Sequence, residues 1–189
     1  MLTEGENTLE IDNKWPEIAI FQTKKYRNAR VEAHNALFWM ARASHSFLDP
    51  TLGNSHLSLF WNEDHGDFRT RLLVDGCQIG LHLPDLELYF CDHGEKVPHS
   101  FWLDDRTPAF VEAWYLVELL HRGIEQEKFS TALPFESPDM LMGDTEDHNA
   151  SLFKTELTGM CECLIGASNI LKIVADQLAR HKNFVNNPG

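Results

Sequence analysis

The sequence has no apolar run near the roughly eighteen residues that span a bilayer, and its N-terminus lacks the basic start and apolar stretch of a signal peptide. We therefore expect a cytoplasmic protein that does not bind membranes. Cysteines are also few. Cys77, Cys91, Cys161 and Cys163 are too irregularly spaced for a disulfide framework and form no C-x-x-C metal or redox motif. We expect them to be reduced residues of the core.

Positive charge is scarce as well. Sixteen Lys and Arg stand against 29 Asp and Glu, which gives a net charge of −13. This sign repels phosphate backbones and anionic lipid surfaces, so nucleic acid and membranes are disfavoured as partners. Such acidity favours solubility, and it would also steer a basic protein or a cationic ligand toward the surface.

Common catalytic motifs are missing too. The sequence contains no G-x-S-x-G, no Walker loop, no G-x-G-x-x-G and no H-E-x-x-H. Nucleotide binding and the common hydrolase mechanisms therefore lose support.

What is present indicates one globular domain. The chain has 189 residues, of which 43% are hydrophobic and 24% charged, near the globular average. Residues 1–14 are polar without a helical or strand period, so we predict a flexible tail there and a single domain over 15–189.

Helical periodicity occurs in three segments. The apolar spacing predicts helices over 28–48, 107–122 and 150–182, the last as one helix or two. The second helix has Thr107 as N-cap and Pro108 at its first position. Its predicted apolar stripe consists of Phe110, Ala113, Trp114, Val117 and Leu120.

Between residues 55 and 103 the apolar period changes to 2, which is typical of strands. Asp75-Gly76 is a favoured two-residue hairpin turn. The alternation predicts an inward set of Leu57, Leu59, Leu72 and Ile79. The fold class expected is α+β, with a five-stranded antiparallel meander covered by helices on one face in two layers.

Ten histidines offer candidate functional groups. Three follow an aspartate, and two of these Asp-His pairs lie in predicted hairpin loops, where both residues are ordinary turn formers. The third, Asp147-His148, ends a long acidic connection over 124–149. Asp144 and His148 there are four residues apart and suit a cation, although a solvated acidic loop before a helix is the preferred interpretation. His34 is either a core histidine or a group that points into a pocket.

Several short segments resemble a bacterial domain family of unknown function. They are Trp15-Pro16-Glu17-Ile18, His34 followed by Phe38 or Trp39, Asn54-Ser55-His56, Glu136-Ser137-Pro138-Asp139, and Asp144 to His148. The family has no established activity. The resemblance implies only that His34, His56, Asp144 and His148 belong together in a polar pocket.

Two functions remain open at this point. One is a non-catalytic binding or interaction protein, with a small ligand or a basic protein as partner. The other is a small-molecule enzyme, hydrolase-like and metal-dependent, that uses His34, His56, Asp144 and His148. If a divalent transition metal binds, we expect His34, His56 and His148 as its ligands, with a carboxylate completing the shell. The sequence does not indicate the oligomeric state.

Overall fold

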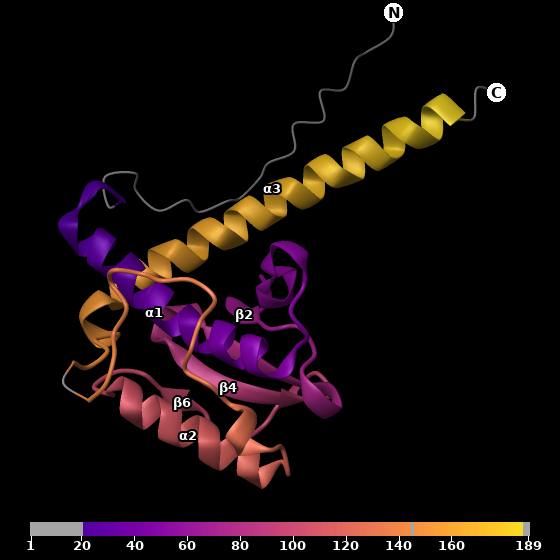
Figure 1. Cartoon of the computed structure of the whole chain (residues 1–189). Helices are drawn as coiled ribbons and strands as arrows, with labels where there is room; N and C mark the ends of the chain where they lie inside the picture. Colours follow the sequence, from indigo (N-terminus) through magenta and orange to yellow (C-terminus); the bar gives the residue numbers. More distant parts are fainter. Residues whose placement is uncertain (1–20, 145, 187–189) are drawn as a thin grey trace, which may run out of the picture.

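The computed structural model describes residues 21–144 and 146–186 (Figure 1). The predicted tail over 1–14 and the Trp-Pro-Glu-Ile segment lie outside the described residues. Within them, helices accompany one open antiparallel sheet, and the predicted α+β class is confirmed.

The three predicted helices are present with slightly shifted ends: α1 is Lys24–Phe47, α2 is Pro108–His121 and α3 is Lys154–Asn186. The side chain of Thr107 caps α2, as expected, by accepting a hydrogen bond from the backbone N–H of Phe110. A short 3-10 turn, η6 (Ser151–Phe153), precedes α3, which is one continuous helix.

The sheet is an antiparallel meander in the order β1-β2-β3-β4-β5, with a sixth strand, β6, also paired with β4. Its strands are β1 (Phe60–Asn62), β2 (Asp67–Arg69), β3 (Cys77–His82), β4 (Glu87–Asp92), β5 (Glu95–Lys96) and β6 (Phe101–Trp102). The fifth strand was expected over 97–103, after a loop; instead β5 lies in that loop segment, only β6 lies within 97–103, and the two pair with opposite ends of β4. Pro98 lies between them, and proline cannot donate a ladder hydrogen bond.

The hairpin at Asp75-Gly76 is confirmed. Asp75 and Gly76 have φ of 54° and 76°, and the N–H of Cys77 donates to the carbonyl of Val74. The inward position predicted for Leu72 is wrong, because Leu72 is 60% exposed while Ile79 is fully buried. The regular ladder ends near Thr70, whose hydroxyl accepts from the N–H of Ile79.

The segment before the first strand also differs from expectation. His56 does not open a strand but lies in η2 (Leu52–Leu57), a 3-10 segment in which Gly53 and Asn54 both have positive φ. These two left-handed residues turn the chain before β1 begins at Phe60.

The core lies between one face of the sheet and the helices. Ala29, Ala33, Ala36 and Ala43 are all buried on α1, and their small side chains let the helix lie close to the sheet. An aromatic cluster joins three elements: Tyr115 of α2 lies 5.8 Å from Trp39 of α1 and 5.9 Å from Phe90 of β4, between ring centroids.

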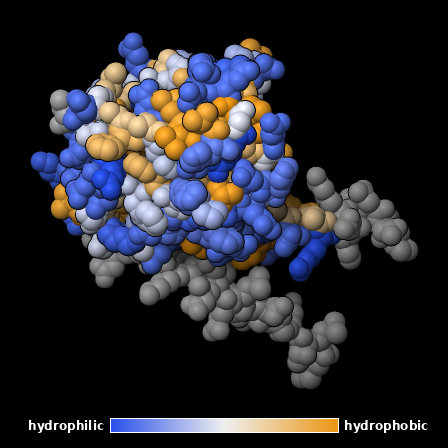
Figure 2. Space-filling model, turned by 90° about the horizontal axis from the view of Figure 1, so that it is seen from below, coloured by the Kyte–Doolittle hydropathy of each residue, from blue (hydrophilic) through white to orange (hydrophobic). Residues whose placement is uncertain are grey.

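Most of the apolar stripe predicted for α2 lies outside its buried face, although Trp114 packs against the core. Phe110, Val117 and Leu120 are exposed, and the core side is formed by Val111, Tyr115 and Leu119. Figure 2 views the molecule from the side where α2 lies in Figure 1 and shows apolar side chains gathered among polar ones. Because α2 is apolar around most of its circumference, the periodicity did not identify the face that is covered.

Candidate ligand-binding site

The site lies on the face of the sheet opposite the core. Antiparallel register places Phe68, Leu81 and Leu88 on the covered face. Their neighbours along the strands therefore lie on the other face. That second face is polar and carries Asp67, Arg69, His82, Glu87 and Tyr89.

A glycine creates the space at the centre of this face. Gly80 of β3 pairs directly with Tyr89 of β4. A Cβ atom at position 80 would lie 2.2 Å from Cζ of Tyr89, closer than atoms approach in proteins. The missing side chain therefore lets the Tyr89 ring lie across β3 and bring its hydroxyl to β2.

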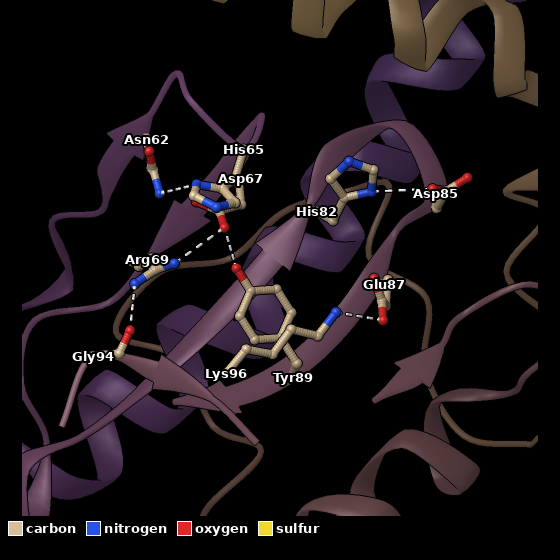
Figure 3. Close-up of a pocket in the computed structure, with 10 residues that line it drawn as sticks. All are labelled: Asn62, His65, Asp67, Arg69, His82, Asp85, Glu87, Tyr89, Gly94 and Lys96. Carbon is tan, nitrogen blue, oxygen red and sulfur yellow. Dashed lines mark hydrogen bonds and ion pairs between the residues drawn. The ribbon is translucent and has the colours of Figure 1, made fainter. Parts of the chain in front are cut away.

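The hydroxyl of Tyr89 donates a hydrogen bond to Oδ2 of Asp67. Asp67 is only 3% exposed, and the same oxygen lies 3.5 Å from Nη2 of Arg69. The guanidinium of Arg69 also donates to the carbonyl of Gly94, so it is held between β2 and the turn before β5 (Figure 3). These contacts fix the carboxylate from two sides.

Two polar atoms at this centre have no protein partner. Oδ1 of Asp67 and Nε of Arg69 are both buried without a hydrogen bond from the described residues. An unpaired buried acceptor or donor costs roughly 1 to 3 kcal/mol. The arrangement thus supplies one acceptor and one donor that a bound ligand or water would satisfy.

The rim of the site holds pre-formed pairs. Nδ1 of His82 lies 3.1 Å from Oδ2 of Asp85, and Nζ of Lys96 donates to Glu87 over 2.7 Å. Figure 3 shows Lys96 extending along the Tyr89 ring, and its Nζ lies 4.4 Å from the ring centroid. Together these residues line a cavity of about 570 Å³, within the range of small-molecule sites.

Two titratable groups of the site, His82 and Tyr89, have shifted pKa values. Burial lowers the pKa of His82, although Glu87 opposes this effect, and the imidazole is therefore neutral near pH 7. Since its Nδ1 faces Asp85, the proton resides there and Nε2 is left as an acceptor. Burial and the hydrogen bond to Asp67 raise the pKa of Tyr89, which keeps this hydroxyl protonated as a donor.

The structure does not bring His34, His56, Asp144 and His148 together. His148 is fully buried, and its Nδ1 lies 3.1 Å from Oε2 of Glu32 on α1. His56 is also buried, but its Nε2 lies 3.5 Å from Nδ1 of His45, near the other end of α1. Glu32 and His45 are thirteen residues apart on one helix, about 20 Å along its axis.

The remaining two residues are exposed. His34 is on the surface of α1, where it borders a small apolar cavity between α1 and α3. Asp144 is exposed in the long connection. Among residues 21–144 and 146–186, no group of three or more His, Cys, Asp or Glu side chains is arranged to hold a metal ion. The proposed ligand set of His34, His56 and His148 is therefore not assembled.

His148 instead belongs to a set of contacts between α1 and the long connection. Asn35, buried on α1, donates to the carbonyl of Asp139 and accepts from the N–H of Leu141. Arg42, also buried, donates to the carbonyl of Thr131. Together with Glu32 and His148, these contacts tie the connection to the helix.

Comparisons with family models, with curated proteins and with solved structures find no match to this chain. The functional inference consequently rests on the geometry of the site alone.

Sequence reasoning missed Asp67, Arg69 and Tyr89. A signal was present in Gly80, because a glycine inside an otherwise regular strand marks a close approach of other atoms. The alternation of Asp67 and Arg69 around Phe68 also indicated a polar face, but nothing in the sequence showed which strands meet there.

Proposed function

We propose that this protein binds a small hydroxylated molecule, of the size of a sugar or polyol, on the polar face of its sheet. The observation that carries this proposal is the buried Asp67 carboxylate, one oxygen of which is fixed by Tyr89 and Arg69 while the other lacks a donor. A ligand hydroxyl would donate a hydrogen bond to this second oxygen of Asp67. Its own oxygen would accept a hydrogen bond from a donor of the site.

The balance of charge supports an uncharged ligand. Each acid of the lining is matched by a base: Asp67 by Arg69, Glu87 by Lys96, and Asp85 by Lys154. Because the pairs neutralise one another, the site demands no net charge from its ligand. Hydroxyl groups both donate and accept, which suits a lining that offers both functions.

The pre-formed pairs lower the entropic cost of binding. Side chains that already hold each other lose little conformational freedom when a ligand arrives. Among the described residues, the lining contains no Ser, Thr or Cys. We therefore favour a binding protein over an enzyme that uses a hydroxyl or thiol nucleophile of Ser, Thr or Cys.

One observation favours a second, catalytic function at the same site. His82, neutral and oriented by Asp85, has the arrangement of a general base, with Nε2 as its free acceptor. Such a group would remove a proton from a bound hydroxyl or a water. Replacement of His82 by Gln would then abolish turnover of the ligand but preserve its binding.

Nucleic acid is not proposed as a partner, because the net charge of −13 opposes it. In an electrophoretic mobility-shift assay, a salt-dependent shift of duplex DNA by the purified protein at micromolar concentration would contradict this expectation.

The test is a calorimetric titration with a panel of monosaccharides and polyols. We expect at least one to bind the wild-type protein, and Asp67→Asn to weaken that binding at least about tenfold, the effect of 1.4 kcal/mol. The matched control is Asp75→Asn, an exposed acid at the hairpin turn, where Asn tolerates the positive φ. Binding that is equally strong in both variants would contradict the proposal.

A further inference from the structure

The second half of α3 carries an apolar stripe that nothing in the described chain covers. Ile170, Leu171, Val174 and Leu178 are exposed, Leu171 by 68% and Leu178 by 60%. Figure 1 shows this half of the helix projecting past the sheet and the other helices.

The stripe continues a row that begins in the core. Leu157, Leu164, Leu171 and Leu178 follow one another at intervals of seven residues. Leu157 is fully buried and Leu164 packs against the core. A strict seven-residue repeat, with Val174 at the intermediate position, is the pattern of helices that wind around a partner helix.

The stripe lies on a different side of α3 from the side chains that anchor this half of the helix. Ser168 and Lys172, on the same part of α3, both contact Glu63 beside β1. At 100° per residue the stripe lies roughly 120° around the helix from these anchoring side chains. The anchoring side is therefore occupied and the apolar side is left accessible.

Membrane insertion does not explain the stripe. By length and composition Ser151–Arg180 is apolar enough to cross a membrane, a property shared by core helices of soluble proteins. Its first half is fixed in the core by Leu157 and Met160. The part from residue 167 to 180 is only about 21 Å long, short of the roughly 30 Å of a hydrocarbon core, and it carries Lys172, Asp176 and Arg180.

The distribution of charge along α3 indicates which partner fits the exposed stripe. The positions that flank Val174 and Leu178 on either side of the stripe, Ala175 and Gln177, are uncharged. In a chain with a net charge of −13, most surfaces bring acid against acid when two copies meet. The exposed stripe of α3 carries no acidic side chain, so two copies can meet there without this repulsion.

We propose that the exposed half of α3 is a self-association surface, on which a second copy of this chain packs its own α3 stripe. Burial of the apolar row provides the driving force, and the uncharged flanks permit close approach. Because the rest of the molecule is strongly acidic, added salt screens the repulsion between copies and strengthens the association.

The experiment is sedimentation of the full chain across the micromolar range at low and moderate salt. The wild-type protein should reach at least twice the monomer mass, with the larger species favoured by salt. Leu171→Glu/Leu178→Glu should remain monomeric, and its circular dichroism should retain the folded signal because both side chains are outside the core. Leu171→Ala/Leu178→Ala, which keeps helix propensity, should also dissociate.

The matched control is Leu120→Glu, a leucine of α2 with 61% exposure, which should associate like the wild type. Three results would overturn the proposal: a wild-type protein that stays monomeric throughout, association lost in Leu120→Glu but kept in the α3 variants, or a monomer that binds vesicles of phosphatidylcholine and phosphatidylglycerol through the α3 stripe.

Discussion

At the scale of single residues, Gly80 determines whether the site exists. It is buried, and the Tyr89 ring occupies the space where its side chain would be. The alternation of the strand predicted that position 80 lies on the face opposite Ile79 and Leu81. It did not predict the close contact, because the contact depends on pairing with a strand whose register the sequence leaves open.

We predict that Gly80→Ala destabilises the protein by roughly 1 to 3 kcal/mol, the usual cost of overpacking. The added methyl group would displace the Tyr89 ring and separate its hydroxyl from Asp67. Urea denaturation measures the loss. In a Tyr89→Ala background the same substitution should cost much less, and an unchanged cost there would show that the ring is not the obstacle.

His148 is the residue for which sequence and structure differ most. It was grouped with a possible metal site on the strength of its acidic neighbours, but it is buried against Glu32 and lines no cavity described above. The pairing joins residues 116 positions apart. Local sequence does not reveal such a contact.

We predict that His148→Ala lowers the free energy of unfolding by roughly 1 to 3 kcal/mol, because Glu32 would be left without its buried partner. Ligand binding at the sheet should be unaffected. His121→Ala, at an exposed histidine, should change stability by less than about 0.5 kcal/mol. Equal stability of the two variants in thermal or urea unfolding would contradict a structural role for His148.

His82 gives a prediction about pH. Its pKa in the folded protein is lower than its ordinary value, mainly through burial, so the unfolded chain binds this proton more readily. Its contribution to stability is therefore complete above the unfolded pKa near 6.5 and is lost as the pH falls through the folded pKa.

The measurement is the urea midpoint from pH 8 down to about pH 5, with His82→Gln as the variant. The wild type should lose more stability across this interval than the variant. Asp67, Asp85, Glu87, Lys96 and Lys154 surround His82 and are identical in the two proteins, which leaves the imidazole as the local difference. Parallel curves for the two proteins would argue against a depressed pKa.

At the scale of elements, the sequence predicted what local patterns determine. The three helices, the antiparallel meander and the Asp75-Gly76 turn follow from periodicity, capping and turn chemistry. The errors occur where tertiary contacts override the pattern. The chain leaves the ladder after Thr70, and so Leu72 is exposed rather than buried.

The orientation of α2 is the clearest case. Apolar side chains occur on both sides of this helix, and only packing against Trp39 and Phe90 selects the side with Tyr115. We predict that Leu119→Ala, at a position 1% exposed, costs about 2 to 5 kcal/mol. Leu120→Ala, one residue further, should cost less than about 1 kcal/mol, mostly from lost surface contact.

Thermal and chemical unfolding of the two leucine variants, compared under the same conditions, distinguish the two orientations. If Leu120→Ala were the more damaging change, α2 would pack by the stripe that the periodicity predicted. Both substitutions introduce the best helix former, so altered helix propensity does not confuse the comparison.

At the scale of the whole molecule, the sheet separates two environments. One face packs against the helices and forms the core, while the other carries the paired charges around Asp67. The projecting half of α3 contacts Glu63 beside β1 and then extends past the sheet (Figure 1). Its stripe residues do not line the cavity of the polar face. Ligand binding and oligomeric state can therefore be tested independently.

The central proposal is that a small hydroxylated ligand binds the polar face of the sheet. The most direct measurement is a ¹H–¹⁵N correlation spectrum of the labelled protein during titration with the sugar or polyol that binds best. We predict that the largest shifts occur at Asp67, Arg69, Gly80, Tyr89 and Lys96. Shifts confined to the surroundings of His34, His56 and His148, or no saturable shift with any member of the panel, would contradict it.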